Sequence, residues 1–455
     1  MTTNRASLIS RELEVSGVSK AVGLSRSLGL SQASISLAIK ELGRRVIVFG
    51  KARSSRYALS RDIGREGDRW ALYSINERGL PELAGQLVAL HQREWAFIPE
   101  SEYGSVNFGE FSDGLYPDLP WFLGTLRPQG FLGRNFAQTI SLQIGLPPDP
   151  GNWAADDVIA AALRNGYDFP GSFILGDEAL EKAQTAFIND AESESSREFR
   201  YPELALQSLN GEFPRSSAGG EQPKFTAYIK EEDVGHVVVK FSGQTDSPSD
   251  KRWRDLLISE QLASESINVT SVAVAKNRIF SLKGRIFLES ERFDRVGDSG
   301  RRFVVSLSAL DGAFYGKADT PWTAAADRLS NDKLISVRDA RCLKWLWWYG
   351  NLIGNDDMHY GNISLLLDGQ GAFELAPCYD MLPMRYRPTS TGEIVHQEPK
   401  PKPPLPQDIE IWRSAAASAL EFWERVRKEN RISNNFSEIA LTNLQVIKKL
   451  RERFD

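Results

Sequence analysis

The segment Asn355-Asp356-Asp357-Met358-His359-Tyr360-Gly361-Asn362 contains several polar residues at a spacing that is known from one class of catalytic loop. It places Asp357 five residues before Asn362, which is the Asp-x-x-x-x-Asn spacing of a kinase-type catalytic loop. In such a loop the carboxylate orients an attacking hydroxyl and accepts its proton, while the amide oxygen holds a divalent cation on the phosphates. Asp and Asn also fill many ordinary turns, so the loop becomes informative only together with the sequence around it.

The sequence on both sides of this loop predicts a supporting framework. An aromatic-rich helix is expected over residues 339–348, and a hairpin of strands 363–367 and 372–375 is expected after the loop. The hairpin returns the chain to Pro377-Cys378-Tyr379-Asp380 beside the loop. Asp380 can therefore be a metal-binding carboxylate, because Mg²⁺ prefers oxygen ligands.

Upstream, an apolar strand over residues 236–240 ends in Lys240, like the Val-Ala-Ile-Lys strand of kinases. A strand over 225–230 precedes it, and before both lies the small-residue loop Ser216-Ser-Ala-Gly-Gly-Glu-Gln-Pro-Lys224. The backbone N–H groups of such a loop can cradle phosphate. A double Gly alone is usually a turn, and a lone Lys is usually a surface charge. The loop, the two strands, Lys240, the Asp-x-x-x-x-Asn spacing and Asp380 occur in the order found in kinases. This ordered set is much less expected by chance than any one of its members.

These motifs resemble the HipA family of bacterial serine/threonine kinases, which are toxins of toxin–antitoxin systems, and in particular its YjjJ-like branch with a fused winged helix. The resemblance covers about residues 65–455 and is strongest in roughly the last 240. The segments that carry it are Ser216–Lys224, Lys240, Glu291-Arg-Phe-Asp294, Leu352–Asn362 and Leu375-Ala-Pro-Cys-Tyr-Asp380.

The resemblance implies a role for each matching residue, with ATP and Mg²⁺ as cofactors. Asp357 would be the catalytic base, Asn362 and Asp380 would be the metal ligands, and Lys240 would contact the phosphates. Glu291 and Phe293 would hold adenine. The implied nucleotide-binding set is Ala218, Gly219, Gly220, Glu221, Gln222, Lys224, Lys240, Glu291, Arg292, Phe293, His359, Asn362, Tyr379 and Asp380.

The resemblance also implies autophosphorylation at Ser216, which ejects the phosphate loop and silences the enzyme, although Ser217 is an equally available hydroxyl. The chain departs from the family at three places. Lys224 is displaced by one position, Gly361 replaces a usual Lys, and Asp255 stands where a Glu should pair with Lys240, with Glu260 nearby.

The charge distribution separates the N-terminal residues from the rest. Residues 1–61 carry eleven Lys and Arg against three Glu, a net charge of +8, so that the remainder carries −13 of the total of −5. A small basic module attached to an acidic body is typical of nucleic-acid binding. A charged, solvated face is the structural alternative.

The pattern within this module favours DNA binding. A helix is expected to end near Leu28, and Ser31 to cap a second helix that ends at Gly43 and buries Ile35, Ile39 and Leu42. Strands over 46–49 and 56–59 follow around a basic turn, which is the order of a winged helix-turn-helix. Such a module can also serve only protein contacts or dimerisation. The candidate DNA-binding residues are Gln32, Ser34, Ser36, Lys40, Lys51, Arg53 and Arg56.

The expected fold class is α+β, with three domains. Residues 1–62 form the winged helix-turn-helix, 63–295 the HipA-like N-terminal subdomain and kinase N-lobe, and 296–455 a mainly helical C-lobe. An antiparallel sheet is expected over about 70–99, helices over 153–210, and final helices at about 409–428 and 436–453.

The composition excludes several other classes of protein. Cys342 and Cys378 are the only cysteines, so a disulfide framework is not expected. The expected location of the protein is the reducing cytoplasm. Four scattered histidines offer no zinc spacing, and no apolar run reaches the roughly 18 residues of a membrane span.

The expected function is an ATP- and Mg²⁺-dependent serine/threonine protein kinase with a DNA-binding domain for autoregulation. The resemblance implies a translation-linked protein substrate such as an aminoacyl-tRNA synthetase. A homodimer on a palindromic site is expected, and a separate antitoxin is left open. One alternative is a non-catalytic transcriptional regulator with a nucleotide-sensing body, and another is a small-molecule kinase.

Overall fold

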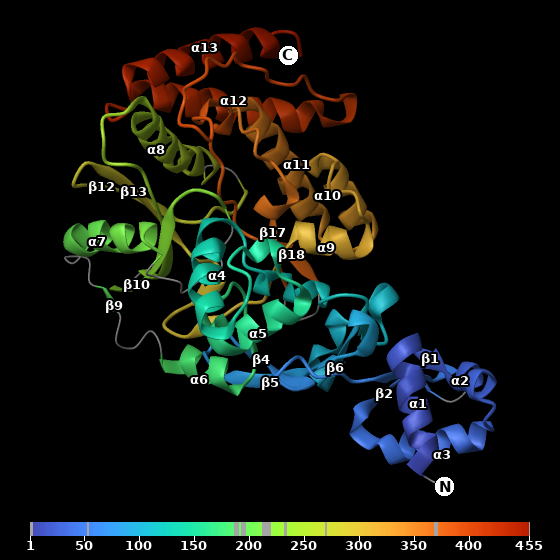
Figure 1. Cartoon of the computed structure of the whole chain (residues 1–455). Coiled ribbons are helices and arrows are strands. Elements are labelled where there is room, and N and C mark those ends of the chain that lie inside the picture. Colours follow the sequence, from blue (N-terminus) through green and yellow to red (C-terminus); the bar gives the residue numbers. More distant parts are fainter. Residues whose placement is uncertain are drawn as a thin grey trace.

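The computed structural model describes residues 3–51, 54–185, 191–192, 197–211, 220–231, 234–268, 271–367 and 372–454. Its helices and mostly antiparallel sheets form a mixed fold in which the N-terminal helices and the last two helices lie at opposite ends (Figure 1).

The N-terminal unit combines three helices with a three-stranded sheet of order β1-β3-β2. Its elements are α1 (Thr3–Ser16), β1 (Ser19–Lys20), α2 (Ala21–Leu28), α3 (Gln32–Leu42), β2 (Val46–Phe49) and β3 (Arg56–Leu59). The prediction for α3 is confirmed: Ser31 Oγ accepts a hydrogen bond from Ser34 N at 3.2 Å, and Gly43 ends the helix with a φ of +58°. Ile35 and Ile39 face the core of this unit together with Ile9 of α1, a helix that the sequence analysis did not identify.

The middle part is built on a five-stranded antiparallel sheet of order β7-β6-β5-β4-β8. The predicted sheet over 70–99 is confirmed, and two further strands extend it. Its elements are β4 (Arg69–Ile75), β5 (Pro81–Ala89), β6 (Trp95–Pro99), β7 (Leu115–Tyr116), β8 (Phe173–Leu175), α4 (Gly130–Ile144), α5 (Ala155–Asn165) and α6 (Asp177–Thr185).

An apolar cluster joins the N-terminal unit to this sheet. Ile47, Phe49 and Ala58 of β2 and β3 pack against Val88 of β5 and Ala96 of β6. This cluster is separate from the internal core of the N-terminal unit. A fragment ending at residue 61 would therefore expose apolar side chains that the full chain buries.

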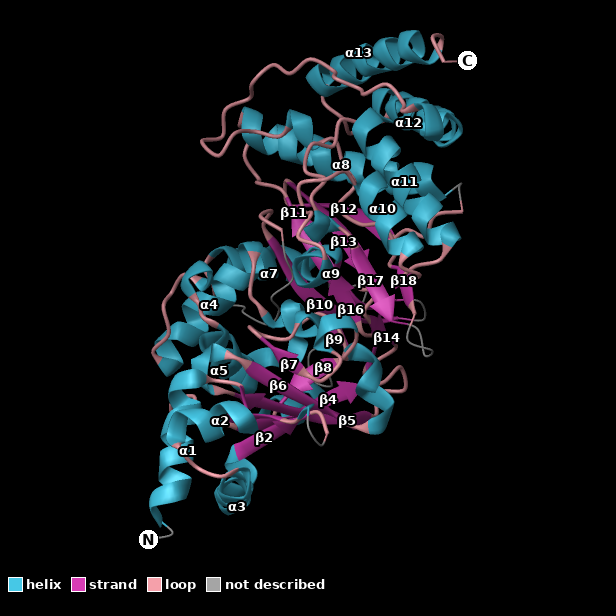
Figure 2. Ribbon diagram, turned by 90° about the vertical axis from the view of Figure 1, so that its right-hand side faces the viewer, coloured by secondary structure: helices cyan, strands magenta, loops and turns pink. Residues whose placement is uncertain are grey.

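A second five-stranded sheet, of order β12-β13-β11-β10-β9, lies between the middle part and the helical end of the molecule (Figure 2). The predicted strands ending near Lys230 and at Lys240 are confirmed. The elements are β9 (Ala191–Glu192), α7 (Arg197–Leu209), β10 (Lys224–Glu231), β11 (Val234–Phe241), α8 (Pro248–Asn268), β12 (Asn277–Leu282) and β13 (Arg285–Glu291).

The C-terminal part is mainly helical and carries a three-stranded sheet of order β16-β17-β18. Its elements are β16 (Val304–Ser306), α9 (Leu307–Phe314), α10 (Trp322–Asn331), α11 (Val337–Leu352), β17 (Ser364–Leu367), β18 (Phe373–Leu375), α12 (Ile409–Lys428) and α13 (Asn434–Arg451). The predicted helix over 339–348, the hairpin after the loop and the final helices are confirmed. Among the described residues, no helix is long and apolar enough to cross a bilayer.

Candidate active site

A cleft of about 1100 Å³ lies between the second sheet, the loop after α11 and the middle part. Most of the nucleotide-binding residues expected from the sequence line it together. These are Gly220, Lys224, Lys240, Glu291, Arg292, Phe293, His359, Asn362, Tyr379 and Asp380. The structure thus brings into one cavity residues that are separated by up to 160 positions along the chain.

Lys240, at the end of β11, is held by two carboxylates. Its Nζ lies 2.5 Å from Glu260 Oε1 on α8 and 2.5 Å from Asp380 Oδ1. The expectation that Asp255 occupies the place of the pairing carboxylate is wrong. Asp255 instead accepts hydrogen bonds from the backbone N and Oγ of Ser433, the residue that caps α13.

The charges around Lys240 perturb one another. Burial opposes the charged form of Lys240, yet Asp380 and Glu260 raise its pKa above the ordinary value. Burial would likewise raise the pKa of Asp380, but Lys240 and Lys224 outweigh it and lower that pKa. Asp380 also has a φ of +53°, an uncommon conformation for a residue with a side chain that is typical of functional sites.

Lys224, at the start of β10, approaches the same carboxylate from the phosphate-loop side. Burial, with a smaller contribution from Lys240, lowers its pKa to about 8, against the opposing effect of Asp380. A Cβ on Gly220 would lie 2.5 Å from Lys224 Nζ, and the φ of Gly220 is +92°. Position 220 therefore accepts only glycine without displacing Lys224.

The loop after α11 is ordered by its own side chains. Asn355 Oδ1 accepts a hydrogen bond from Asp357 N at 3.0 Å, and Asn362 Nδ2 donates to Asp357 O at 2.8 Å. Asn355 is buried, while Asp357 is half-buried and His359 is exposed. Asn355 is a positioning residue that the sequence motif alone does not identify, since its role depends on where its side chain folds back.

Two aromatic rings border the cleft near the end of β13. The Phe293 and Tyr379 centroids lie 5.5 Å apart, and Tyr379 Oη is 2.8 Å from Ser364 Oγ. The Glu291 carboxylate is 3.4 Å from Lys276 Nζ.

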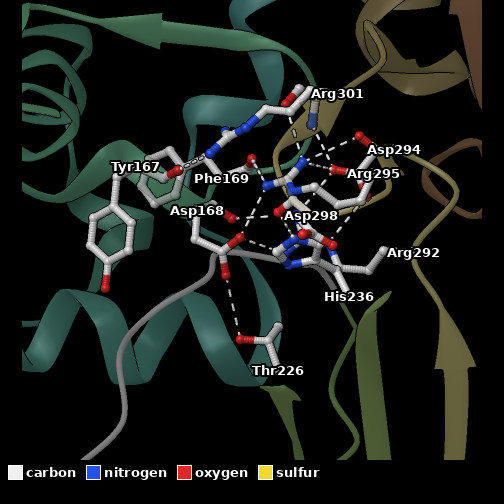
Figure 3. Close-up of polar contacts among 11 residues, drawn as sticks. Tyr167, Asp168, Phe169, Thr226, His236, Arg292, Asp294, Arg295, Asp298 and Arg301 are labelled. Carbon is white, nitrogen blue, oxygen red and sulfur yellow. Dashed lines mark hydrogen bonds and ion pairs between the residues drawn. The ribbon is translucent and has the colours of Figure 1, made fainter. Parts of the chain in front are cut away.

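Arg292 is part of a buried ion cluster that ties this segment to the middle part (Figure 3). Its guanidinium lies 2.6 Å from Asp168 and 3.0 Å from Asp294, and Arg295 contacts the same two carboxylates. Burial opposes ionisation of Asp168, yet Arg292 and Arg295 lower its pKa below the ordinary value. No sequence pattern links Asp168 to residues more than 120 positions away, so this cluster could not be predicted from the sequence.

Other residues expected at the nucleotide and autophosphorylation sites either are not described or do not line the cleft. Ser216, Ser217, Ala218 and Gly219 fall outside the described residues. Glu221 forms an ion pair with Arg134, and neither Glu221 nor Gln222 is among the described residues that line the cleft.

The candidate DNA-binding residues differ in their accessibility. Gln32, Ser36, Lys40 and Lys51 are exposed, whereas Ser34 is half-buried and lies 3.0 Å from Ser31 Oγ. Arg56 forms an ion pair with Asp113 of the middle part, and both residues line the cleft. Arg53 lies outside the described residues.

Comparison with known proteins places the chain in a family. Over 445 residues it is 33% identical to Toxin YjjJ of Escherichia coli strain K12, which covers 97% of this chain and 98% of that protein. The chain belongs to the YjjJ-like branch of the HipA toxin family. The family model described as YjjJ-like toxin, middle domain, matches residues 66–184, and the HipA-like C-terminal domain matches 216–444. The HipA-like region therefore contains Lys240, Asp357, Asn362 and Asp380.

One solved structure agrees with a HipA fold. A chain of the Shewanella oneidensis MR-1 complex of HipA, HipB and operator DNA superposes with a TM-score of 0.55 and 15% identity, covering 84% of this chain and 97% of that one. The Helicobacter pylori proinflammatory kinase CtkA gives a TM-score of 0.36 at 15% identity, covering 52% of this chain and 92% of that one, which is too low to bear on the fold.

Proposed function

We propose that this HipA-like chain is an ATP- and Mg²⁺-dependent protein kinase that phosphorylates serine or threonine. The observation that carries the proposal is that Lys240, which pairs with Glu260 and Asp380, lines one cleft together with Asp380 and with Asn362 of the loop that also holds Asp357. A lysine paired with a helix glutamate, next to an aspartate and an Asp-x-x-x-x-Asn loop, is the arrangement that phosphoryl transfer uses.

The chemistry of the lining fits a nucleotide. Lys224 and Lys240 provide positive charge for phosphates. Gly220 has no side chain, so phosphates can approach its backbone closely. Phe293 and Tyr379 offer aromatic surface for a base. ATP, when bound, would supply the phosphoryl group for transfer.

The donor set also fits Mg²⁺. Asp380 offers carboxylate oxygens, and Asn362 uses its amide nitrogen to contact Asp357 O, which leaves the amide oxygen available. Mg²⁺ bound to a nucleotide needs only one or two protein oxygen ligands, because phosphates and water complete its coordination.

Asp357 is the residue proposed to act on the hydroxyl group of the phosphate-accepting serine or threonine. Its carboxylate would orient the serine or threonine and accept the hydroxyl proton as the new bond forms. Asn355 and Asn362 hold the backbone of Asp357 on both sides, so the base is positioned before the substrate arrives.

The protein substrate and the self-modification rest on family resemblance. The cleft is also lined by Glu110 and Asp113 of the middle part, which offer a surface for an acceptor segment. A translation-linked target such as an aminoacyl-tRNA synthetase, and Ser216 as the autophosphorylation site, are the proposals that follow from the family.

We further propose that the N-terminal unit is a winged helix-turn-helix that binds double-stranded DNA. The sheet order β1-β3-β2 behind α2 and α3, the net charge of +8 over residues 1–61 and the exposure of Gln32, Ser36 and Lys40 support it. The similar solved structure is described as a complex that contains operator DNA, which concerns that complex alone.

One experiment separates the kinase from a non-catalytic, nucleotide-sensing regulator. The purified full chain is incubated with labelled ATP and Mg²⁺, and phosphate is located by mass spectrometry, with Asp357→Asn as the matched control. The kinase predicts incorporation that the variant loses, at Ser216 or Ser217 if the chain modifies itself. A regulator predicts equal nucleotide binding by both proteins and phosphate in neither.

A further inference from the structure

Helix α4 of the middle part begins directly against the described end of the phosphate loop. Phe131 N, in the first turn of α4, donates a hydrogen bond to Gly220 O at 2.9 Å. One turn later Arg134 forms an ion pair with Glu221 at 2.6 Å. Two consecutive loop residues are therefore contacted by a helix that lies about 90 positions earlier in the chain.

Gly130, the first residue of α4, is what allows this approach. A Cβ at this position would lie 2.4 Å from Gly220 O, 2.6 Å from Gly220 N and 2.8 Å from its carbonyl carbon. These neighbours are backbone atoms, so they could move only if the loop itself moved. The φ of Gly130 is +63°, which adds strain for any side chain.

Gly220 is thus enclosed on two sides. A Cβ on Gly220 itself would meet Lys224 Nζ at 2.5 Å, while Gly130 lies against its backbone. Lys224 and Asp380 line the cleft beside it. Any displacement of Gly220 therefore changes the surroundings of the lysine and carboxylate proposed to bind the nucleotide.

The helix is firmly anchored, so it can act as a rigid support. Phe136, Ala137 and Ile140 are buried in the main core. On another face, Asn135 Nδ2 donates to Ser208 O at 2.8 Å, and Thr139 Oγ1 donates to Gly211 O at 3.3 Å. The same helix contacts the chain on both sides of residues 212–219, at Gly211 and at Gly220.

We infer that α4 is a clamp for the phosphate loop, in which Gly130, Phe131 and Arg134 are positioning residues for nucleotide binding. This inference rests on the proposed nucleotide site for its functional consequence, whereas the contacts themselves do not. Because the Arg134 and Glu221 side chains are both exposed to solvent, their ion pair is the weaker part of the clamp. The close backbone approach at Gly130 is the stronger part.

The chain offers a matched control for Gly130. Gly145 follows the other end of α4 with a φ of +75°, and a Cβ there would meet nothing within 4 Å. Gly130→Ala and Gly145→Ala therefore add comparable backbone strain to the same helix, but only the first pushes against the phosphate loop. We expect Gly130→Ala to raise the KM for MgATP by roughly ten- to a hundredfold with a smaller change in kcat. Gly145→Ala should leave both constants near those of the parent.

Hydrogen exchange of the nucleotide-free full chain tests the clamp without any activity. Gly130→Ala should speed exchange at residues 220–224 and at the Phe131 amide, while the amides of β11 and β13 stay protected as in Gly145→Ala. If parent protein binds no MgATP, the proposed function fails, and this exchange pattern still decides whether the clamp exists. Equal exchange and equal MgATP binding in the two glycine variants would overturn the clamp.

A second pair of variants guards against misfolding of Gly130→Ala. Arg134→Glu should weaken MgATP binding a fewfold, and combining it with Glu221→Arg should restore the parent value, because the ion pair is rebuilt in reverse. Failure of the double variant to recover, with hydrogen exchange of α4 unchanged, would remove Arg134 from the clamp.

Discussion

Lys240 pairs with Glu260, and the Nζ and Oε1 atoms of the two side chains lie 2.5 Å apart in the buried wall of the cleft. Both side chains are more than nine-tenths buried. Asp255, five residues earlier on α8, points to the N-terminus of α13 instead. The helix therefore uses one carboxylate for the site and another to hold the C-terminal helix.

These two carboxylates should respond differently to neutralisation. Glu260→Gln removes the negative charge of the helix residue that pairs with Lys240 and should lower kcat/KM by roughly ten- to a hundredfold. Asp255→Asn loses a charged acceptor for Ser433 and should lower the free energy of unfolding by about 1–2 kcal/mol with unchanged kinetics. Steady-state kinetics and urea unfolding on both variants measure the contrast. If Asp255→Asn lowered kcat/KM and Glu260→Gln affected only stability, Asp255 would be the functional partner of Lys240.

Asp357 and Asp380 should separate chemistry from binding. Asp357→Asn removes the base and should slow phosphoryl transfer by about 10²–10⁴ while MgATP still binds, since the nucleotide contacts come from other residues. Asp380→Asn removes a metal ligand and should weaken MgATP binding as well as turnover. Calorimetric binding and phosphate incorporation are measured in parallel. Parent-level turnover by the Asp357 variant would contradict its role.

MgATP affinity should depend on pH through Lys224. Burial lowers the pKa of Lys224 to about 8 in the free protein, so the ammonium loses its proton above that pH. Bound phosphates favour the charged amine, and affinity should therefore fall by up to about tenfold per pH unit between about pH 8 and 9.5. Lys224→Arg remains charged and should flatten this profile. The charge of Lys240 should persist, because its neighbouring carboxylates raise its pKa despite burial. If the affinity of Lys224→Arg fell with pH as steeply as that of the parent, Lys224 would not be the group responsible for the pH dependence.

The buried ion cluster should make stability pH-dependent through His236. Burial, with Arg295 and Arg292 adding to it, lowers the pKa of His236 to about 4. The unfolded chain binds this proton near pH 6.5 and the folded chain does not, so stability should fall by up to about 3 kcal/mol between about pH 6.5 and 4.

His236→Gln should flatten the pH dependence of unfolding within that window, whatever its effect on absolute stability. Asp168 and Asp294 have depressed pKa values, so their contribution is present above about pH 4 and is lost only below it. Chemical unfolding at several pH values gives the slope. Parallel profiles for the two proteins would show that His236 is not the titrating group.

Asp113 should restrain DNA binding by holding Arg56. Asp113→Asn frees the guanidinium for a phosphate contact, so the slope of log affinity against log salt should steepen by about 0.9 for the full chain. Asp118→Asn is the control, because Asp118 pairs with Arg127 at 2.8 Å within the middle part. Fluorescence anisotropy with double-stranded DNA measures the slopes. Equal slopes for the two variants would leave Arg56 outside the interface.

The sequence alone determined the elements whose signals are local. The caps Ser31 and Gly43, the apolar strand that ends in Lys240, and the spacing of Asp357 and Asn362 each lie within about a dozen residues. Local spacing reports helix faces, strand alternation and loop chemistry directly, so these features and their order along the chain could be predicted.

Which distant groups come into contact depends on the tertiary packing. Five residues along a helix correspond to a rotation of about 140°, so the choice between Asp255 and Glu260 depends on how α8 packs. Asp168 reaches Arg292, and Gly130 reaches Gly220, through the packing of the middle part on the second sheet. Such contacts depend on long-range burial and on how closely two backbones can approach, and neither produces a periodic pattern in the sequence. These contacts hold in place the segments on which the site is built.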